Sequence, residues 1–429
     1  RTAEDAERFF QEYIRAIDAV GAAQAQNKFA RASGISVKLS ALHPRYEMAQ
    51  RERVLREMVL RLVALCEQAA RYNIPVTIDA EEADRLLLSL DVAKELLHHL
   101  KISGWDAGLG FAVQAYQKRS IAVIDFFAGL AKQHKRRLHI RLVKGAYWDT
   151  EIKRAQERGW DDFPVYTRKA STDVSYLNCA RRMLECGDTI KPVFGTHNAL
   201  TVAHIVELAG DPGRVEFQRL HGMGEDLGRI MQREGLKCCV YAPVGYHDVL
   251  LGYLVRRILE NGANSSFVHR LLDASVPVDE LVTHPVDEIS SFMSPRHPSI
   301  KRPADLYGDR RNSAGFDLTD PVVTEPLVLQ IAALQQKKYS AASVVGGEEV
   351  TDGKVAALVE KTFARASQAF VNWNNTPISQ RAACLESLAD LLEKNRPEAI
   401  SLLISEGRKT IPDALSEVRE AVDFCRYYA

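Results

Sequence analysis

The sequence lacks the features that direct a chain to a membrane, to nucleic acid or to an oxidising compartment. No apolar run reaches the roughly 20 residues that a bilayer-spanning helix needs, and no signal-peptide pattern opens the chain. Its 56 basic and 56 acidic side chains cancel, so no net charge attracts a polyanion. The seven cysteines are an odd number without a Cys-x-x-Cys pair, which favours buried, reduced thiols. We therefore expect a globular protein of the cytoplasm.

Short apolar or alternating runs recur along the first part of the chain, and each is followed by a helical pattern. Strand and helix in alternation are typical of parallel βαβ units, and seven units predict a TIM-like (β/α)8 barrel with one strand missing. Because a helical pattern at 2–20 comes first, we expect the missing strand just upstream of Arg1. An open doubly wound sheet is the alternative, but its Gly-x-Gly-x-x-Gly turn is absent. The seven runs are 35–42, 75–82, 109–116, 138–143, 192–197, 215–220 and 237–242.

The pattern changes after about residue 290. The proline-rich segments 294–298 and 301–303 are typical of a linker. Helical patterns then follow at 355–373, 379–395 and 411–428. The sequence thus predicts a barrel domain at 1–290, a linker at 291–319 and the start of a second, mainly helical domain at 320–429.

Side-chain alternation divides most of the strand candidates into an apolar face and a mixed face. Successive side chains of a strand point to opposite faces, and the apolar face suits the surrounding helices. The mixed face must then point into the barrel, near the C-terminal strand ends where barrel active sites lie. It predicts a pocket for a charged ligand, with purely structural ion pairs as the alternative. Its polar members are Lys38, Asp79, Gln114, Arg141 and Tyr241.

Two adjacent arginines, Arg256 and Arg257, lie in a helical pattern that follows Tyr241. The apolar stripe of that helix leaves both arginines and Glu260 on the opposite side. Taken alone, the pair fits a solvated face. Beside a polar barrel mouth it predicts a carboxylate site, because guanidinium groups offer forked donors.

Eight motifs stand in the order found in the proline dehydrogenase domain of the proline utilisation A family, which the chain resembles over residues 1–290. They are 34–42 (GISVKLSAL), 78–82 (IDAEE), 110–116 (GFAVQAY), 141–148 (RLVKGAYW), 195–198 (GTHN), 216–224 (EFQRLHGMG), 241–245 (YAPVG) and 253–257 (YLVRR). The part after 320 resembles the opening helices of an aldehyde dehydrogenase.

The resemblance implies an FAD-dependent enzyme that oxidises L-proline to pyrroline-5-carboxylate by passing a hydride to flavin N5. Electrons would continue to a membrane quinone, which implies transient peripheral contact with the inner membrane. A homo-oligomer is expected for the full-length protein. NAD would serve only its second enzyme, whose nucleotide loop and nucleophilic cysteine are not in this sequence. The DNA-binding segment of some members is also not seen, so DNA binding stays open.

The same resemblance assigns residues to the substrate and the cofactor. Arg256, Arg257 and Lys38 would clamp the proline carboxylate, with Asp79 and Glu260 offsetting part of the charge. Tyr241 and Leu220 would pack on the proline ring, and Tyr147 would line the same pocket. The residues expected to bind FAD are Asp79, Ala80, Gln114, Arg141, Val143, Lys144, Gly145, Ala146, Tyr147, Trp148, Arg168, Lys169, Thr196, His197, Asn198, Gln218, Leu220, Glu260, Ser266 and Phe267.

Other interpretations remain open at this point. Lys38 on its strand could form a Schiff base in a barrel lyase, although Asp79 would favour the charged, unreactive lysine. A barrel that does not close could instead be a non-catalytic scaffold. A metal centre is disfavoured, because His221, His247 and His269 lack a tight ligand spacing.

Overall fold

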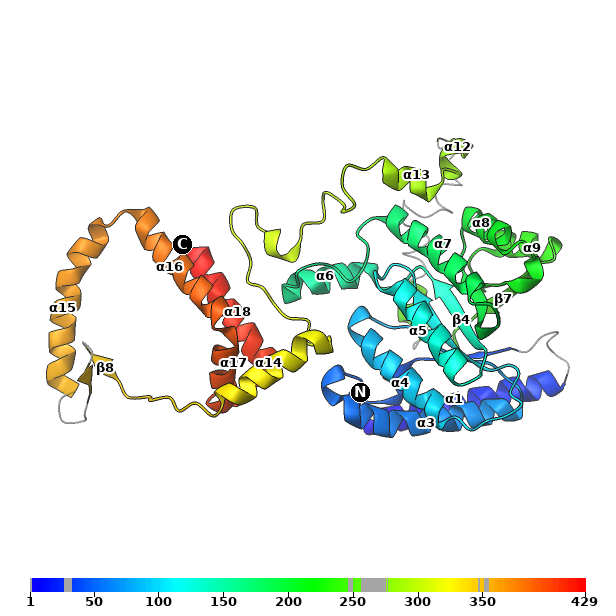
Figure 1. Cartoon of the computed structure of the whole chain (residues 1–429), viewed down its shortest axis with the longest axis horizontal. Helices are drawn as coiled ribbons and strands as arrows, with labels where there is room; N and C mark the ends of the chain where they lie inside the picture. The colour runs from blue at the N-terminus through cyan, green and yellow to red at the C-terminus, as the bar shows by residue number, and fades with distance from the viewer. Residues whose placement is uncertain are drawn as a thin grey trace. The chain divides into compact units, whose positions relative to one another are not determined.

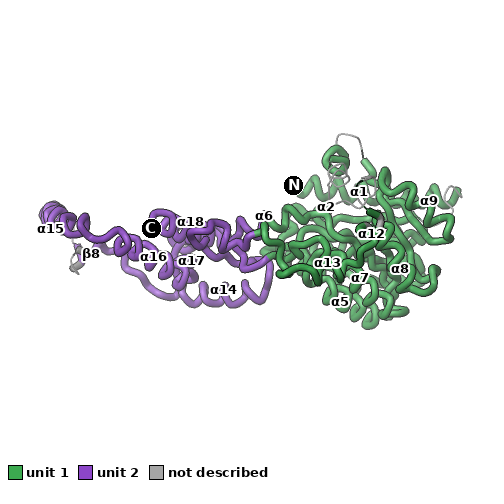
Figure 2. Tube along the Cα trace, turned by 90° about the horizontal axis from the view of Figure 1, so that it is seen from above, with its two compact units in different colours: residues 1–153, 163–300 green, residues 154–162, 301–429 purple. Residues whose placement is uncertain are grey.

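The computed structural model describes residues 2–26, 33–245, 250–255, 275, 277–345, 348–350 and 355–429. Two compact units make up the chain (Figure 2). Unit 1 contains residues 1–153 and 163–300, and unit 2 contains residues 154–162 and 301–429.

Unit 1 is built on a parallel sheet whose seven strands stand in chain order. Each strand pairs with its neighbour in the sequence, which confirms the predicted βα alternation. Within the described residues β1 and β7 are the edges, so the eighth strand stays a prediction. The strands are β1 (Ile35–Val37), β2 (Val76–Ile78), β3 (Leu109–Gln114), β4 (Leu138–Val143), β5 (Ile190–Gly195), β6 (Glu216–Leu220) and β7 (Lys237–Tyr241).

Helices cover the apolar face of this sheet (Figure 1). α1 packs on α3, and α3 packs on α4. The longer helices of unit 1 are α1 (Ala3–Ala25), α3 (Arg51–Arg71), α4 (Leu86–His99), α5 (Ser120–Gln133), α6 (Trp148–Arg158, which ends in unit 2), α7 (Lys169–Glu185), α8 (Ala199–Ala209) and α9 (Glu225–Arg233). The shorter ones are α2 (Leu39–Leu42), η1 (Met48–Gln50), η2 (Ala83–Arg85), η3 (Gly187–Thr189), η4 (Pro212–Arg214), α12 (Val278–Leu281) and α13 (Pro285–Ser290).

The core of unit 1 lies between the sheet and these helices. Val37, Ile78, Phe111 and Ile140 stand side by side on adjacent strands and are all buried. Phe111 stacks on Phe127 of α5 with ring centroids 4.5 Å apart. The apolar alternation of the sequence therefore faces the helices, as predicted.

Five of the seven strands are shorter than the sequence runs that predicted them, whereas β4 has the predicted bounds and β5 begins and ends two residues earlier than predicted. Residues 39–42 were expected to continue the first strand but form the helix α2. The reason is tertiary: β1 and β2 pair only over three residues, and the Ser40 amide then donates to Glu81 Oε1 at 2.8 Å. Tyr116 and Glu81, expected on strand faces, likewise lie in the turns that follow β3 and β2.

Unit 2 is a helical assembly with a small two-stranded hairpin. The three helices predicted from the sequence are present, whereas α14 and α17 were not predicted. Its elements are η5 (Pro303–Asp305), α14 (Pro321–Leu334), β8 (Val344–Val345), β9 (Glu348–Glu349), α15 (Val355–Asn375), α16 (Ile378–Lys394), α17 (Arg396–Ser405) and α18 (Ile411–Tyr428). Leu327, Ile331, Ile400, Leu415 and Val418 form its buried cluster.

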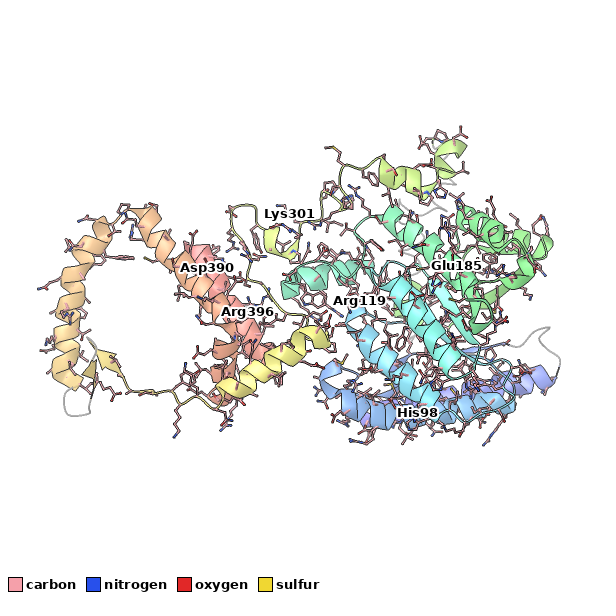
Figure 3. The ribbon with its side chains drawn as sticks, viewed as in Figure 1. His98, Arg119, Glu185, Lys301, Asp390 and Arg396 are labelled. Carbon is pink, nitrogen blue, oxygen red and sulfur yellow. The ribbon has the colours of Figure 1, made fainter. Side chains whose placement is uncertain are left out.

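A second, polar cluster holds segment 313–314 onto α16 and α18. Arg426 Nη2 lies 2.8 Å from Glu393 Oε2 and 3.1 Å from Asp390, which Figure 3 labels on α16. Glu393 also accepts the Ala314 amide at 2.8 Å. Asp423 accepts both the amide and the hydroxyl of Ser313 at 2.7 Å.

We expect the substitution Glu393→Gln to make the free energy of unfolding of unit 2 less dependent on pH in the acidic range. Burial alone would raise the pKa of Glu393, but hydrogen bonds from Arg426 and the Ala314 amide lower it below its usual 4.5. A lowered carboxyl pKa stabilises the folded state above the unfolded pKa, and this contribution is lost as the pH falls through the folded pKa. The variant should be about 1–3 kcal/mol less stable at pH 7, with the difference shrinking below pH 4.5.

Urea unfolding of the intact chain, read by peptide-resolved hydrogen exchange, follows the two units separately. Glu420→Gln, an exposed change on α18, is the matched control and should cost almost nothing. A Glu393→Gln difference that stayed constant from neutral to acidic pH would contradict the assigned hydrogen bonds.

Candidate active site

Four polar side chains meet on the concave face of the sheet, two from within β1 and β4 and two from the C-terminal ends of β2 and β7. Arg141, only 8% exposed, donates through Nη1 to Ser36 Oγ at 3.0 Å. Its Nη2 pairs with the Asp79 carboxylate. The Tyr241 hydroxyl donates to the other oxygen of Asp79 at 3.1 Å, and the Arg141 guanidinium lies 5.2 Å from the Tyr241 ring centroid. The mixed strand faces therefore point inward, as the sequence predicted.

The hydrogen bond between Tyr241 and Asp79 shows that the sheet is strongly curled. Tyr241 ends β7, whereas Asp79 directly follows β2, five strand positions away. In a flat sheet five spacings would separate the two strands by roughly 24 Å. The sheet is therefore curled far enough for side chains of distant strands to meet inside it.

Burial fixes the protonation of the groups that line this interior. It raises the pKa of Tyr241, and the Asp79 carboxylate raises it further, so the phenol keeps its proton and remains a donor. Two residues before Arg141 on β4, burial lowers the pKa of His139 to about 4, so this imidazole is neutral at pH 7. Lys191 and Glu216 pair at 3.3 Å across β5 and β6. The interior is thus polar along its length.

The turns after β3 and β4 pack closely against each other. The Tyr116 amide donates to the Lys144 carbonyl at 2.8 Å. Gly145 lies directly on the Tyr116 ring with a φ of 132°, and a Cβ there would stand 2.6 Å from ring atoms. Only glycine satisfies both the backbone angle and the space. Gln114 ends β3 and accepts from Gln117 Nε2 at 2.8 Å, with both side chains buried.

The rest of the turn after β4 runs into α6. Lys144 forms an ion pair with Asp173 of α7. Trp148 is about one-third exposed and donates through its indole nitrogen to the Tyr166 carbonyl at 2.8 Å. Val143, Gly145 and Tyr147 are half-buried, and Ala146 is exposed.

The motif Thr196–Asn198 links the end of β5 to β6 and α8. The Thr196 hydroxyl accepts the Asn198 amide at 3.2 Å, and Asn198 caps α8 by accepting the Thr201 amide. His197 Nε2 accepts the Leu220 amide at 2.9 Å. His197 therefore holds the backbone of a residue expected to pack on the substrate, a contact that the sequence did not indicate.

The remaining predicted residues are spread over other environments. Lys38 is half-buried, and its backbone amide donates to the Tyr13 hydroxyl at 3.0 Å. The Arg168 guanidinium stacks on Phe292 at 3.9 Å and donates to the Ser294 carbonyl, while Lys169 begins α7 on the surface. Ala80 and Leu220 are half-buried. Arg256, Arg257, Glu260, Ser266 and Phe267 lie outside the described residues, as do His247 and His269.

Sequence reasoning missed three contributors to this region. Ser36 lay on the correctly predicted inward face, two residues before Lys38, so the alternation could have identified it. Gln117 and Glu151 gave no signal, because each is a single polar residue whose burial depends on contacts with distant segments.

The residues present fit the flavin dinucleotide that the resemblance implies. Gln218 Oε1 is buried and has no hydrogen-bond partner among the described residues, so it can accept from a ligand N–H. Arg141, Gln114 and Lys144 supply the donors that an oxygen-rich, anionic cofactor requires. In the described parts of the chain no cluster of three or more His, Cys, Asp or Glu could hold a metal ion, and no helix is long and apolar enough to cross a membrane.

Comparisons with known proteins match both units. The sequence profile of the proline dehydrogenase family matches residues 1–270, and that of the aldehyde dehydrogenase family matches residues 338–429. The bifunctional protein PutA of Salmonella typhimurium is 46% identical over all of the chain and 35% of its own length. A crystal structure of a Bradyrhizobium japonicum PutA mutant superposes with a TM-score of 0.91 at 47% identity, covering 100% of this chain and 43% of that one.

A plant relative matches only the first part. Mitochondrial proline dehydrogenase 2 of Arabidopsis thaliana is 28% identical over 55% of this chain and 51% of its own. The chain spans about a third of the length of the curated PutA relatives it matches.

We expect Gly145→Ala to destabilise unit 1 by about 2–4 kcal/mol, because the new methyl group meets the Tyr116 ring and the φ angle is strained. Gly187→Ala is the matched control: its φ is also positive, at 56°, but nothing lies within 4 Å of its Cβ. It should cost only about 1 kcal/mol. Thermal unfolding compares the two, and equal losses would show that the contact with Tyr116 is unimportant.

Proposed function

The chain belongs to the proline dehydrogenase family, with a segment of the aldehyde dehydrogenase family after it, and on that premise we propose that unit 1 oxidises L-proline to pyrroline-5-carboxylate with FAD. The observation that carries the proposal is the Ser36–Arg141–Asp79–Tyr241 cluster. It supplies a fixed cation, a fixed anion and an oriented phenol within one curled sheet. A bound flavin would supply the chemistry by accepting a hydride from the substrate carbon.

Arg141 is the residue best placed to act on the flavin ring. Its guanidinium is held from two sides, by Ser36 and by Asp79, so it needs no rearrangement when negative charge develops beside it. Gln114 at the end of β3 and Gln218 at the end of β6 would bind the polar edge of the ring. Gln218 Oε1 supports this assignment, because it is buried and lacks a protein donor among the described residues.

The remainder of the dinucleotide would follow the turns after β4 and β5. Val143 to Trp148, Thr196 to Asn198 and the Arg168–Lys169 pair are the residues we assign to it, together with Asp79, Ala80 and Leu220. One observation supports a path along this edge: Lys144 is held by Asp173 as a fixed positive charge.

The substrate would lie over the same cluster. Tyr241 is oriented by Asp79 and can pack its ring on proline, with Leu220 and Tyr147 beside it. We assign the proline carboxylate to Lys38, Arg256 and Arg257, with Glu260 offsetting part of their charge. The described helix at 250–255 ends just before the two arginines, so this assignment rests on the family resemblance. Holding the carboxylate in this way fixes the ring against the flavin.

Wider proposals rest on the family alone. The curled sheet would be part of an eight-stranded barrel, with domains at 1–290 and 320–429 joined by a linker at 291–319. Ser266 and Phe267 would complete the cofactor site. Electrons would pass to a membrane quinone through peripheral contact of a cytoplasmic protein, which would assemble as a homo-oligomer at full length. The second domain would use NAD.

We expect the purified chain to carry flavin absorbance that L-proline bleaches without oxygen. D-Proline is the control, since its carboxylate and reacting carbon cannot both occupy their positions in a chiral site. A flavin that stayed oxidised in L-proline would refute the proposal. A colourless protein that borohydride trapped on Lys38 would favour a Schiff-base lyase instead.

We expect Arg256→Met to raise the KM for proline about 10- to 100-fold while FAD stays bound, because one charge-assisted hydrogen bond to the carboxylate is lost. Arg233→Met on the exposed surface of α9 removes the same side chain elsewhere and should change nothing. Steady-state kinetics and the flavin-to-protein absorbance ratio measure both effects. Loss of FAD from Arg256→Met would show that this arginine holds the cofactor.

A further inference from the structure

Glu151 is an acidic residue with no exposed surface, and among the described Asp and Glu residues it is the most deeply buried. It lies in the first turns of α6, directly after the turn that contains Gly145 and Tyr147. A buried carboxylate is costly to fold around unless hydrogen bonds replace its water. The contacts of the Glu151 carboxylate therefore indicate which parts of the structure it holds in place.

Glu151 Oε1 accepts the Ala83 amide at 2.7 Å. Ala83 begins η2, four residues after Asp79, and so ends the turn that follows β2. Glu151 and Ala83 are 68 positions apart in the sequence. One hydrogen bond thus joins the turn that carries Asp79 to the helix that begins beside Tyr147.

The turn after β3 joins this arrangement through Tyr116, whose pKa is raised by burial and then by the Glu151 carboxylate. The buried Tyr116 ring lies under Gly145, and its amide holds the Lys144 carbonyl. Glu151 thus joins the turn after β2 to α6, and Tyr116 joins the turn after β3 to the turn after β4, so the three turns are held together.

We propose that Glu151 is a positioning residue of the flavin site, whose carboxylate fixes the turn carrying Asp79 against the turn from Lys144 to Trp148. The inference rests on the proposed function, because its importance depends on a flavin lying along these turns. The hydrogen bond of Glu151 is to the turn that carries Asp79, one of the residues assigned to the flavin. Its loss should therefore affect cofactor geometry and leave substrate affinity nearly intact.

Glu151→Gln separates positioning from folding. Glutamine has nearly the same shape and keeps an oxygen for the Ala83 amide, but it removes the charge that strengthens this bond. We expect the melting temperature to change little. In the protein stripped of flavin, amide exchange of the peptide covering 79–86 should rise about 10-fold, since the open state becomes more populated.

Cofactor measurements complete the test. Titration of the stripped protein with FAD, followed by flavin fluorescence, should show about 10-fold weaker binding. Rapid mixing with L-proline should show flavin reduction about 10-fold slower, with the apparent proline affinity within threefold of the original. Glu151→Asp keeps the charge on a shorter arm and should recover part of both losses. Asp149→Asn, an exposed change in the same turn of α6, is the control and should leave every value unchanged.

Each result either supports or overturns the proposed positioning role of Glu151. Unchanged exchange, FAD binding and reduction rate in Glu151→Gln would overturn the inference. Unfolding of both Glu151→Gln and Glu151→Asp would also overturn it, because Glu151 would then be needed for folding itself. If the unmodified chain binds FAD but L-proline does not bleach it, the proposed function fails instead. The exchange and FAD titrations still judge the role of Glu151 in that case.

Discussion

The Asp79 carboxylate is the interaction on which the arrangement of unit 1 depends. One of its oxygens pairs with Arg141 on β4, and the other accepts the Tyr241 hydroxyl from β7. Arg141 also donates a hydrogen bond to Ser36 on β1, so this cluster of four side chains joins both edge strands of the described sheet to its middle. Removal of one partner from such a buried pair costs about 3–5 kcal/mol, because the other charge is left uncompensated. The curl of the sheet, its polar interior and the candidate active site therefore all depend on the same contacts.

The apolar face of the sheet makes this polar interior possible. The row from Val37 to Ile140 buries its side chains against the helices, and this burial provides the nonspecific part of folding. The inward face is then free to carry groups that a smaller core could not accommodate. Turn geometry adds the remaining constraint: Gly145 lies on Tyr116, and Glu151 accepts the Ala83 amide, so the turns after three adjacent strands are fixed relative to one another.

Much of this arrangement could be predicted from the sequence, and the part that could not has a physical explanation. Alternation along the strands placed Asp79, Arg141 and Tyr241 inside the sheet, because strand periodicity is a local property. It failed at 39–42, where the Ser40 amide finds Glu81 and the chain turns into α2. The hydrogen bond from the Leu220 amide to the His197 imidazole nitrogen, which joins residues 23 positions apart, was not predicted. Glu151 gave no signal for the same reason, since a contact across 68 positions leaves no pattern in either segment.

The directionality of hydrogen bonds explains why carboxylates lie at the centre of both polar clusters. Apolar contacts are not directional, so an aliphatic interior would tolerate several curvatures of the same seven strands. Hydrogen bonds weaken steeply when their angle is wrong, and a carboxylate with two oxygens can impose two directions at once. Asp79 does this between β4 and β7, and Glu393 does it in unit 2 between Arg426 and the Ala314 amide. In both units a largely buried carboxylate holds two partners in fixed directions, which apolar contacts alone do not do.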